Sequence, residues 1–143
     1  MRNIRLPDTP PSLEQRIALT DQQIEQIGRL TIQLSEALDG LPVVVSQQGE
    51  IVHSAGAVDH VVAERLVRVA DRVWREGGSH IAREVIRFEE EVIEEIERAN
   101  FVVYSIHIAG ALTLTVGWQM AISLTQLRAE VSDVKAQLLR VLR

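Results

Sequence analysis

The sequence predicts an α+β domain in which helices pack on a five-stranded antiparallel sheet, in the order α-β-β-α-β-β-β-α. Apolar residues recur at helical spacing near the start, in the middle and at the end of the chain. Short runs rich in β-branched residues lie between these segments, and capping residues and glycines mark the boundaries. The 143 residues fit one domain, predicted over residues 20–143, preceded by a flexible arm over residues 1–19.

The composition excludes several classes of function. The chain carries 15 Lys and Arg against 20 Asp and Glu, which argues against nucleic-acid binding because phosphates require a clustered basic surface. It has no cysteine, so disulfides and thiolate chemistry are excluded. The N-terminus lacks an apolar signal segment, and the most apolar window, residues 106–124, is interrupted by polar residues. We therefore expect a cytoplasmic protein that does not insert into a membrane.

The arm contains three prolines and no sustained periodicity, although residues 14–19 would suit a short helical turn. A first helix is predicted from Thr20, which forms a capping box with Gln23. This helix should end before Gly40 and Pro42. Its apolar stripe comprises Ile24, Ile27, Leu30, Leu34, Ala37 and Leu38.

A β-hairpin is predicted after the first helix. Residues 42–46 and 51–54 are short β-branched runs, and residues 47–50 separate them. Gly49 in this connection can adopt the positive φ angle of a tight turn. The two runs should therefore pair as antiparallel neighbours.

Residues 59–76 are predicted to form a helix, with Asp59 as its N-cap and Gly77 and Gly78 as its stop. At ~100° per residue, its apolar side chains cover an arc of roughly 160°, which exceeds the roughly 100° stripe that a helix on one sheet needs. The excess width predicts two separate contacts. Val62, Leu66, Val69 and Val73 are expected on the chain's own sheet, and Ala63, Val67, Ala70 and Trp74 on a second molecule.

Residues 82–90 loosely alternate in polarity, with Ile86 and Phe88 on one face, and this pattern predicts a third strand. The alternative is a helix that runs on through Ile96, because glutamate is a strong helix former. The stretch 89–98 holds six glutamates and is expected to be a solvated loop. A divalent-cation site there is disfavoured, since the stretch lacks the glycine-containing spacing of such sites.

Residues 101–109 and 111–118 predict a long apolar hairpin that turns at Gly110 and lies at the centre of the sheet rather than at its edge. A closing helix follows from Ser123, which is capped against Gln126. The stripe of this helix is narrow enough for one surface, although its spacing would also suit a short coiled coil. It comprises Leu124, Leu127, Val131, Val134, Leu138 and Val141.

With these elements in place, residues 20–142 resemble the roadblock family, which includes the dynein light-chain roadblock domain and bacterial MglB-like small-GTPase regulators. The resemblance rests on LSEALDGLPVVVSQQGEIVHSAG, on the helix over 59–76, and on ALTLTVGW with its long closing helix. It implies a roadblock/profilin-like sheet and a dimer in which the middle helices pair antiparallel and the third strands join two sheets. It also implies a Ras-like small GTPase as partner, or a scaffold role. The acidic stretch and the proline-bearing arm depart from the family pattern.

The sequence contains no catalytic or metal-binding motif. His53, His60, His80 and His107 do not pair at the spacing of helical metal ligands, and neither a nucleophile elbow nor a P-loop is present. His107 is interpreted as a hydrogen-bonded sheet residue, because buried polar groups are usually satisfied. We predict no catalytic residue, no metal and no cofactor.

The polar side of the helix over 59–76 carries a basic strip formed by Arg65, Arg68, Arg72 and Arg75. Its ordinary interpretation is a solvated face balanced by neighbouring acidic residues. Its functional interpretation is a landing surface for an acidic partner or, in the extreme, an arginine finger. Of the two tryptophans, Trp118 is expected in the core, whereas Trp74 suits an interface anchor.

These observations predict a non-enzymatic homodimeric regulator or scaffold that binds a Ras-like small GTPase, with a GTPase-activating or switch-ordering role. The predicted dimer interface comprises Ala63, Val67, Ala70, Trp74, Ile86 and Phe88. One alternative is a ligand-binding sensory module of the profilin-like or GAF-like type, and another is a purely structural scaffold subunit. A ligand-binding module should bring polar side chains to an interior cavity, and apart from Tyr104, His107 and a few threonines the predicted sheet offers little of this kind.

Overall fold

The structure is a computed structural model that describes residues 15–56, 60–76, 84–88, 102–119 and 121–143. The described helices are α1 (Asp21–Ala37), α2 (His60–Glu76) and α4 (Leu124–Val141). The described strands are β1 (Val43–Gln47), β2 (Glu50–Ala55), β3 (Glu84–Phe88), β4 (Val102–Ala109) and β5 (Leu112–Trp118). The α+β class predicted from the sequence is confirmed.

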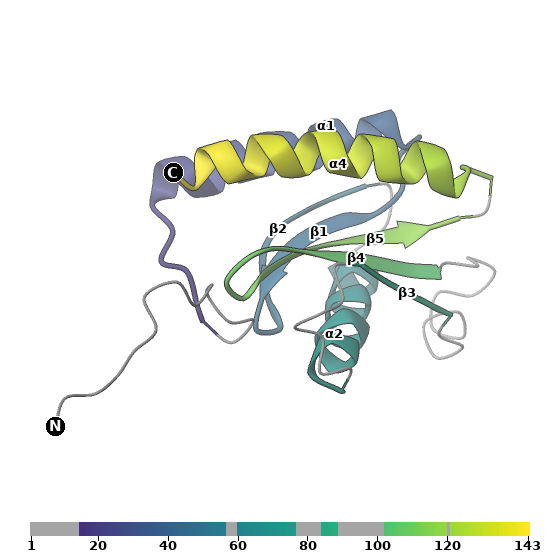
Figure 1. Cartoon of the computed structure of the whole chain (residues 1–143), viewed down its shortest axis with the longest axis horizontal. Helices are drawn as coiled ribbons and strands as arrows, with labels where there is room; N and C mark the ends of the chain where they lie inside the picture. Colours follow the sequence, from purple (N-terminus) through teal and green to yellow (C-terminus); the bar gives the residue numbers. More distant parts are fainter. Residues whose placement is uncertain (1–14, 57–59, 77–83, 89–101, 120) are drawn as a thin grey trace, which may run out of the picture.

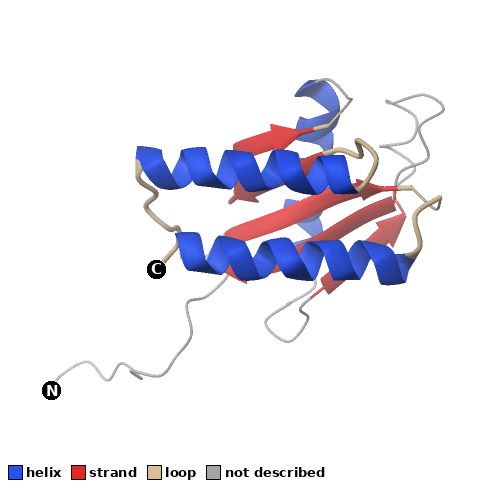
Figure 2. Cartoon of the chain, turned by 90° about the horizontal axis from the view of Figure 1, so that it is seen from above, coloured by secondary structure: helices blue, strands red, loops and turns tan. Residues whose placement is uncertain are grey.

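The strands form one sheet in the order β2-β1-β5-β4-β3, and every neighbouring pair is antiparallel. The hairpin of β4 and β5 occupies interior positions, as its apolar character predicted. Helices cover both faces of the sheet: α1 and α4 lie together on one face, and α2 lies on the other (Figures 1 and 2). The domain therefore has three layers. No helix in the described part of the chain is long and apolar enough to cross a membrane.

The caps of α1 and α4 form as predicted. Thr20 accepts a hydrogen bond from the backbone of Gln23, whose side chain accepts one from the backbone of Thr20. Ser123 accepts from the backbone of Gln126 in the same way. The buried stripe of α1 differs from the predicted one, because Ala37 is exposed and Ile24 is half-buried, while Gly28, Thr31 and Ser35 are buried. Side by side over the sheet (Figure 2), α1 and α4 contribute to a main core that also includes residues of α2.

The two hairpin turns depend on left-handed backbone. Gln48 and Gly49 have φ angles of 51° and 80°, the pattern of a two-residue turn that matches the twist of a hairpin. The turn is thus shorter than the four-residue connection predicted over 47–50, although the role of Gly49 is confirmed. Gly110 joins β4 to β5 at a φ of 54°. The predicted strand over 82–90 is confirmed over Glu84–Phe88, whereas the acidic stretch 89–98 lies outside the described residues.

The apolar arc of α2 faces a single surface, and here the prediction needs correction. Ala63, Val67, Ala70 and Trp74, which were expected on a second molecule, are between 1% and 6% exposed within the chain itself. Ala63 and Val67 pack with Val44 of β1. The chain's own sheet therefore covers the wide arc, because α2 contacts four of the strands, β2, β1, β5 and β4. The predicted N-cap Asp59 and the stop at residues 77 and 78 lie outside the described residues.

Candidate functional site

The outward side of α2 carries a row of polar side chains that the fold leaves open. His60, Glu64, Arg68 and Arg75 are exposed along it or at its edge, and Asp71 is half-buried between them. Two contacts join residues one helical turn apart: an ion pair of Arg75 with Asp71 at 2.7 Å, and a contact of the His60 imidazole with the Glu64 carboxylate at 3.4 Å. Such exposed pairs contribute little to stability. They give the surface a pattern of alternating charge.

A shallow hollow of about 290 Å³ lies between this side of α2 and the β1–β2 turn. Its wall on the turn side comes from Gly49 and Ile51. The helix contributes four polar side chains, His60, Glu64, Arg68 and Asp71. The hollow therefore offers both signs of charge to a protruding side chain of a partner, because acidic residues lie among the arginines of the predicted strip.

The four arginines of the predicted strip do not share one environment. Arg68 and Arg75 are exposed, whereas Arg65 and Arg72 are half-buried. Arg75 is held by Asp71, while Arg68 makes no ion pair or hydrogen bond within the described part of the structure. Arg68 is thus the arginine of the strip that is best placed to pair with a carboxylate of a partner.

Of the residues predicted for a dimer interface, only Ile86 is seen exposed, at 38%. It lies on β3, which ends the strand order of the described sheet and pairs with β4 on one side. The side chain of Phe88 lies outside the described part of the structure. A second exposed apolar residue is Val61 of α2, at 55%, the one residue that interrupted the polar side of the helix in the sequence. Exposed apolar area therefore remains at both elements that the roadblock resemblance assigns to dimer contacts.

A polar cluster that the sequence did not predict holds β3 against α4. Arg128 of α4 donates two hydrogen bonds to the Glu84 carboxylate, at 2.6 and 3.0 Å, and the Tyr104 hydroxyl donates a third, at 2.5 Å. The hydrogen bonds from Arg128 lower the pKa of Glu84, and burial raises the pKa of Tyr104. The three residues come from different elements, so no spacing along the chain connects them before the strand register is known.

Polar side chains of β4 and β5 form hydrogen bonds, whereas the buried Nδ1 of His53 on β2 has no hydrogen-bond partner among the described residues. Trp74 donates to the Ser105 hydroxyl at 2.9 Å, and Ser105 shares a hydrogen bond with Thr115 at 3.0 Å. His107 bonds through Nε2 to the Gly110 carbonyl at 2.7 Å, as expected for a satisfied sheet residue. Within the described residues, no three metal-ligating side chains gather. The interior therefore presents little polar chemistry to a small ligand.

Several solved structures are similar to the chain. Myxococcus xanthus MglB shares 14% identity, covering 87% of this chain and 93% of its own, with a TM-score of 0.65. The gliding protein mglB from Thermus thermophilus shares 11% identity over 90% and 97%, with a TM-score of 0.63. A Roadblock/LC7 domain from Streptomyces avermitillis shares 14% identity over 78% and 97%, with a TM-score of 0.59.

No family model and no curated protein matches the sequence. The likeness is therefore one of fold, and at these identities it establishes the fold alone. The chain has the roadblock fold, as its resemblance to that family implied.

Proposed function

We propose that this protein is a non-enzymatic regulator or scaffold of the roadblock type, which acts as a homodimer and binds a Ras-like small GTPase. The observation that carries the proposal is the fold shared with the MglB structures along about nine-tenths of both chains. The resemblance of the sequence to the roadblock family implies the class of partner, a Ras-like small GTPase. Because folds host many functions, the proposal also needs a surface on this chain suited to such a partner.

The polar side of α2 supplies that surface. It is exposed, carries both signs of charge and borders the hollow beside the β1–β2 turn. Arg68 lines the hollow and makes no ion pair within the described residues. Complementary charge at such a surface favours one partner over others and accelerates association. We assign the GTPase contact to this side of α2, with Arg68 as its central cation.

The arginines of α2 sit in a regular helix, which bears on how the partner would be regulated. An arginine finger must reach the phosphates of a bound nucleotide, and a rigid helix on the face of a sheet limits that reach. We therefore propose that the protein acts by stabilising one arrangement of the partner's switch regions rather than by donating a catalytic group.

The proposed dimer uses surfaces that the single chain leaves exposed. Strand β3 has no neighbouring strand on its outer edge within the described residues, and Ile86 on it is partly exposed; we assign this edge to pairing with a second β3. The buried residues Ala63, Val67, Ala70 and Trp74 act in this proposal as the support that positions α2, and they do not contact the second copy.

A pull-down against the small GTPases of the same genome tests the partner. The immobilised protein is incubated with each GTPase loaded with GDP or with a non-hydrolysable GTP analogue. We expect at least one GTPase to be retained, and retention to fall with Arg68→Glu. Arg29→Glu, an exposed charge reversal on the opposite face of the sheet, is the matched control. Retention of no GTPase in either nucleotide state would overturn the proposal.

A further inference from the structure

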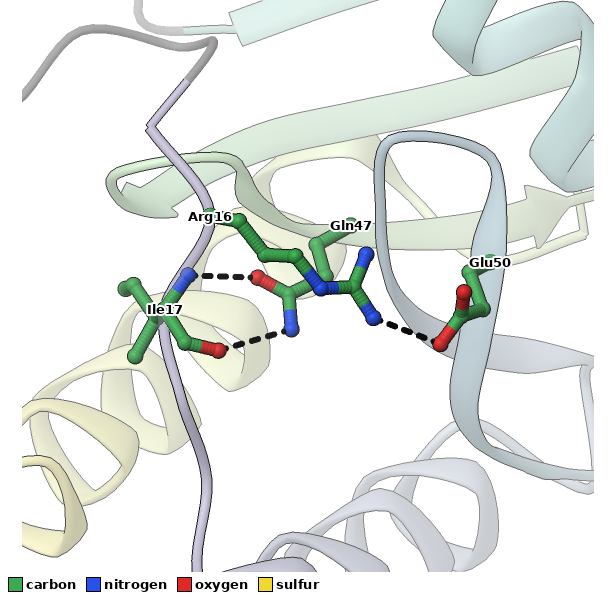
Figure 3. A network of polar contacts seen from close by, with 4 residues as sticks. All are labelled: Arg16, Ile17, Gln47 and Glu50. Carbon is green, nitrogen blue, oxygen red and sulfur yellow. Dashed lines mark hydrogen bonds and ion pairs between the residues drawn. The ribbon is translucent and has the colours of Figure 1, made fainter.

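Residues 15–17 lie across the tips of both hairpins in an extended conformation (Figure 3). The amide of Ala111, beside the β4–β5 turn, donates to the Gln15 carbonyl at 2.7 Å. On the other hairpin, the side chain of Gln47 accepts from the Ile17 amide at 2.9 Å and donates to the Ile17 carbonyl at 3.0 Å. Arg16 forms an ion pair with Glu50 at 2.6 Å. The predicted helical turn over 14–19 is therefore absent from the described residues 15–19.

Gln47 is the central element of this contact. It is 4% exposed, and the backbone of Ile17 satisfies both the oxygen and the nitrogen of its side-chain amide. A buried amide without partners would cost free energy, so the fold gains from this glutamine when an extended backbone lies beside it. The side-chain amide of Gln47 bonds to both the N–H and the C=O of Ile17, as the backbone of a neighbouring strand would.

Gly110 supplies the room for the contact. A Cβ at this position would lie 2.6 Å from the Gln15 carbonyl oxygen and 2.9 Å from Cγ1 of Ile17. Its φ of +54° also disfavours other residues. The side chain of Ile17 therefore packs against Gly110 at a distance that only glycine permits, and it joins the edge of the main core.

We infer that the tips of the two hairpins form a peptide-recognition site and that residues 15–17 are its ligand, bound within the same chain. Gln47 recognises the extended backbone, Gly110 accommodates the β-branched residue, and Glu50 favours a basic residue before it. The ion pair is exposed on both sides and adds selectivity more than affinity. Two residues, Ala18 and Leu19, connect this segment to the cap of α1, so the tether keeps the local concentration of the ligand high.

The direct test supplies the ligand separately. In the full chain, Arg16→Glu with Ile17→Gly weakens the tethered ligand and leaves the site unchanged. A synthetic peptide with the sequence of residues 13–20 is then titrated to millimolar concentration while NMR follows the amide of Ala111. We expect saturable shifts in this variant. In the wild-type chain, where the site is filled, we expect much smaller ones.

Two controls distinguish specific binding of the peptide from nonspecific binding. Gln47→Ala in the weakened chain should abolish the saturable shifts, and a peptide carrying Arg16→Glu should bind more weakly than the native peptide. The amide spectrum reports in each case that the domain remains folded. No binding to the folded, weakened chain, or binding that is indifferent to Gln47, would overturn the inference.

Trypsin gives a second measurement on chains in which residues 15–17 are unchanged. It cleaves after arginine, and Arg16 lies inside the docked segment. Gln47→Ala should accelerate cleavage between Arg16 and Ile17 by about tenfold or more, since two hydrogen bonds are lost. Gln33→Ala, an exposed glutamine change on α1, should leave the rate unchanged. Equal rates in the wild-type and Gln47→Ala chains would also contradict the inference.

Discussion

Trp74 of α2 donates a hydrogen bond from its indole nitrogen to the hydroxyl of Ser105 on β4, at 2.9 Å. The bond is buried, and Ser105 shares a second buried bond with Thr115 of β5. This contact ties the C-terminal half of α2 to β4 and β5, two of the three interior strands of the described sheet. Trp74, which the sequence suggested as an interface anchor, is instead buried within the domain. The polar side of α2 remains exposed to partners.

Removing the acceptor of this bond should destabilise the domain. Ser105→Ala leaves the buried indole N–H without its partner, and we expect the free energy of unfolding to fall by about 1–3 kcal/mol. Urea denaturation measures the change. Ser132→Ala makes the same chemical change at an exposed position of α4 and should stay within about 0.5 kcal/mol of the wild type. A loss in Ser105→Ala no larger than that of the control would contradict the role given to the bond.

Charge substitutions should separate folding from association. Val67→Glu places a carboxylate at a position that is 3% exposed, so we expect loss of the folded state by circular dichroism. Ile86→Glu changes an exposed position on β3, and we expect a folded monomer by light scattering. The wild-type chain should be a dimer at micromolar concentration. A wild-type monomer under these conditions would remove the proposed dimer.

The packing of α1 on β2 depends on a glycine. A Cβ on Gly28 would lie 2.7 Å from two atoms of the His53 ring. Gly28→Ala should therefore destabilise the domain by about 1–3 kcal/mol, although alanine favours a helix. In a thermal denaturation cycle, His53→Ala should remove most of that cost, because the clashing ring is gone. Equal costs of Gly28→Ala in both backgrounds would show that the contact is not the cause.

The cluster around Glu84 should give the domain a specific dependence on pH. The hydrogen bonds from Arg128 lower the pKa of Glu84 below its ordinary 4.5. The stability from this carboxylate is therefore present above pH 4.5 and is lost as the pH falls through the lowered pKa. Glu84→Gln should lower the urea midpoint at neutral pH, and the difference from wild type should shrink in acid. A difference that is constant across this range would contradict the role of the charge.

The elements could be predicted because their signals are local. Thr20 with Gln23 and Ser123 with Gln126 mark helix starts within four residues, and Gly49 marks a turn by its own backbone preference. The apolar pattern likewise placed the β4–β5 hairpin away from the edge of the sheet. Each of these inferences needs only neighbouring residues, so the fold class followed from the sequence.

The surfaces could not be predicted in the same way, because they depend on contacts across the sheet. The width of the apolar arc on α2 was correct, but the sequence does not say how far one sheet can cover a helix, and Val44 contacts the part assigned to another molecule. The Glu84 cluster and the contact of Gln47 with Ile17 join residues at least 20 positions apart. Such contacts appear only when the strand register is known.

The affinity of the partner GTPase for charge variants of α2 tests the central claim most directly. Isothermal titration with the GTPase identified by pull-down should show binding to the wild-type chain and to Arg29→Glu with similar dissociation constants. Arg68→Glu should bind roughly tenfold or more weakly, because it reverses a charge at the centre of the assigned contact. Equal affinity of Arg68→Glu and Arg29→Glu would contradict the claim that the polar side of α2 receives the partner.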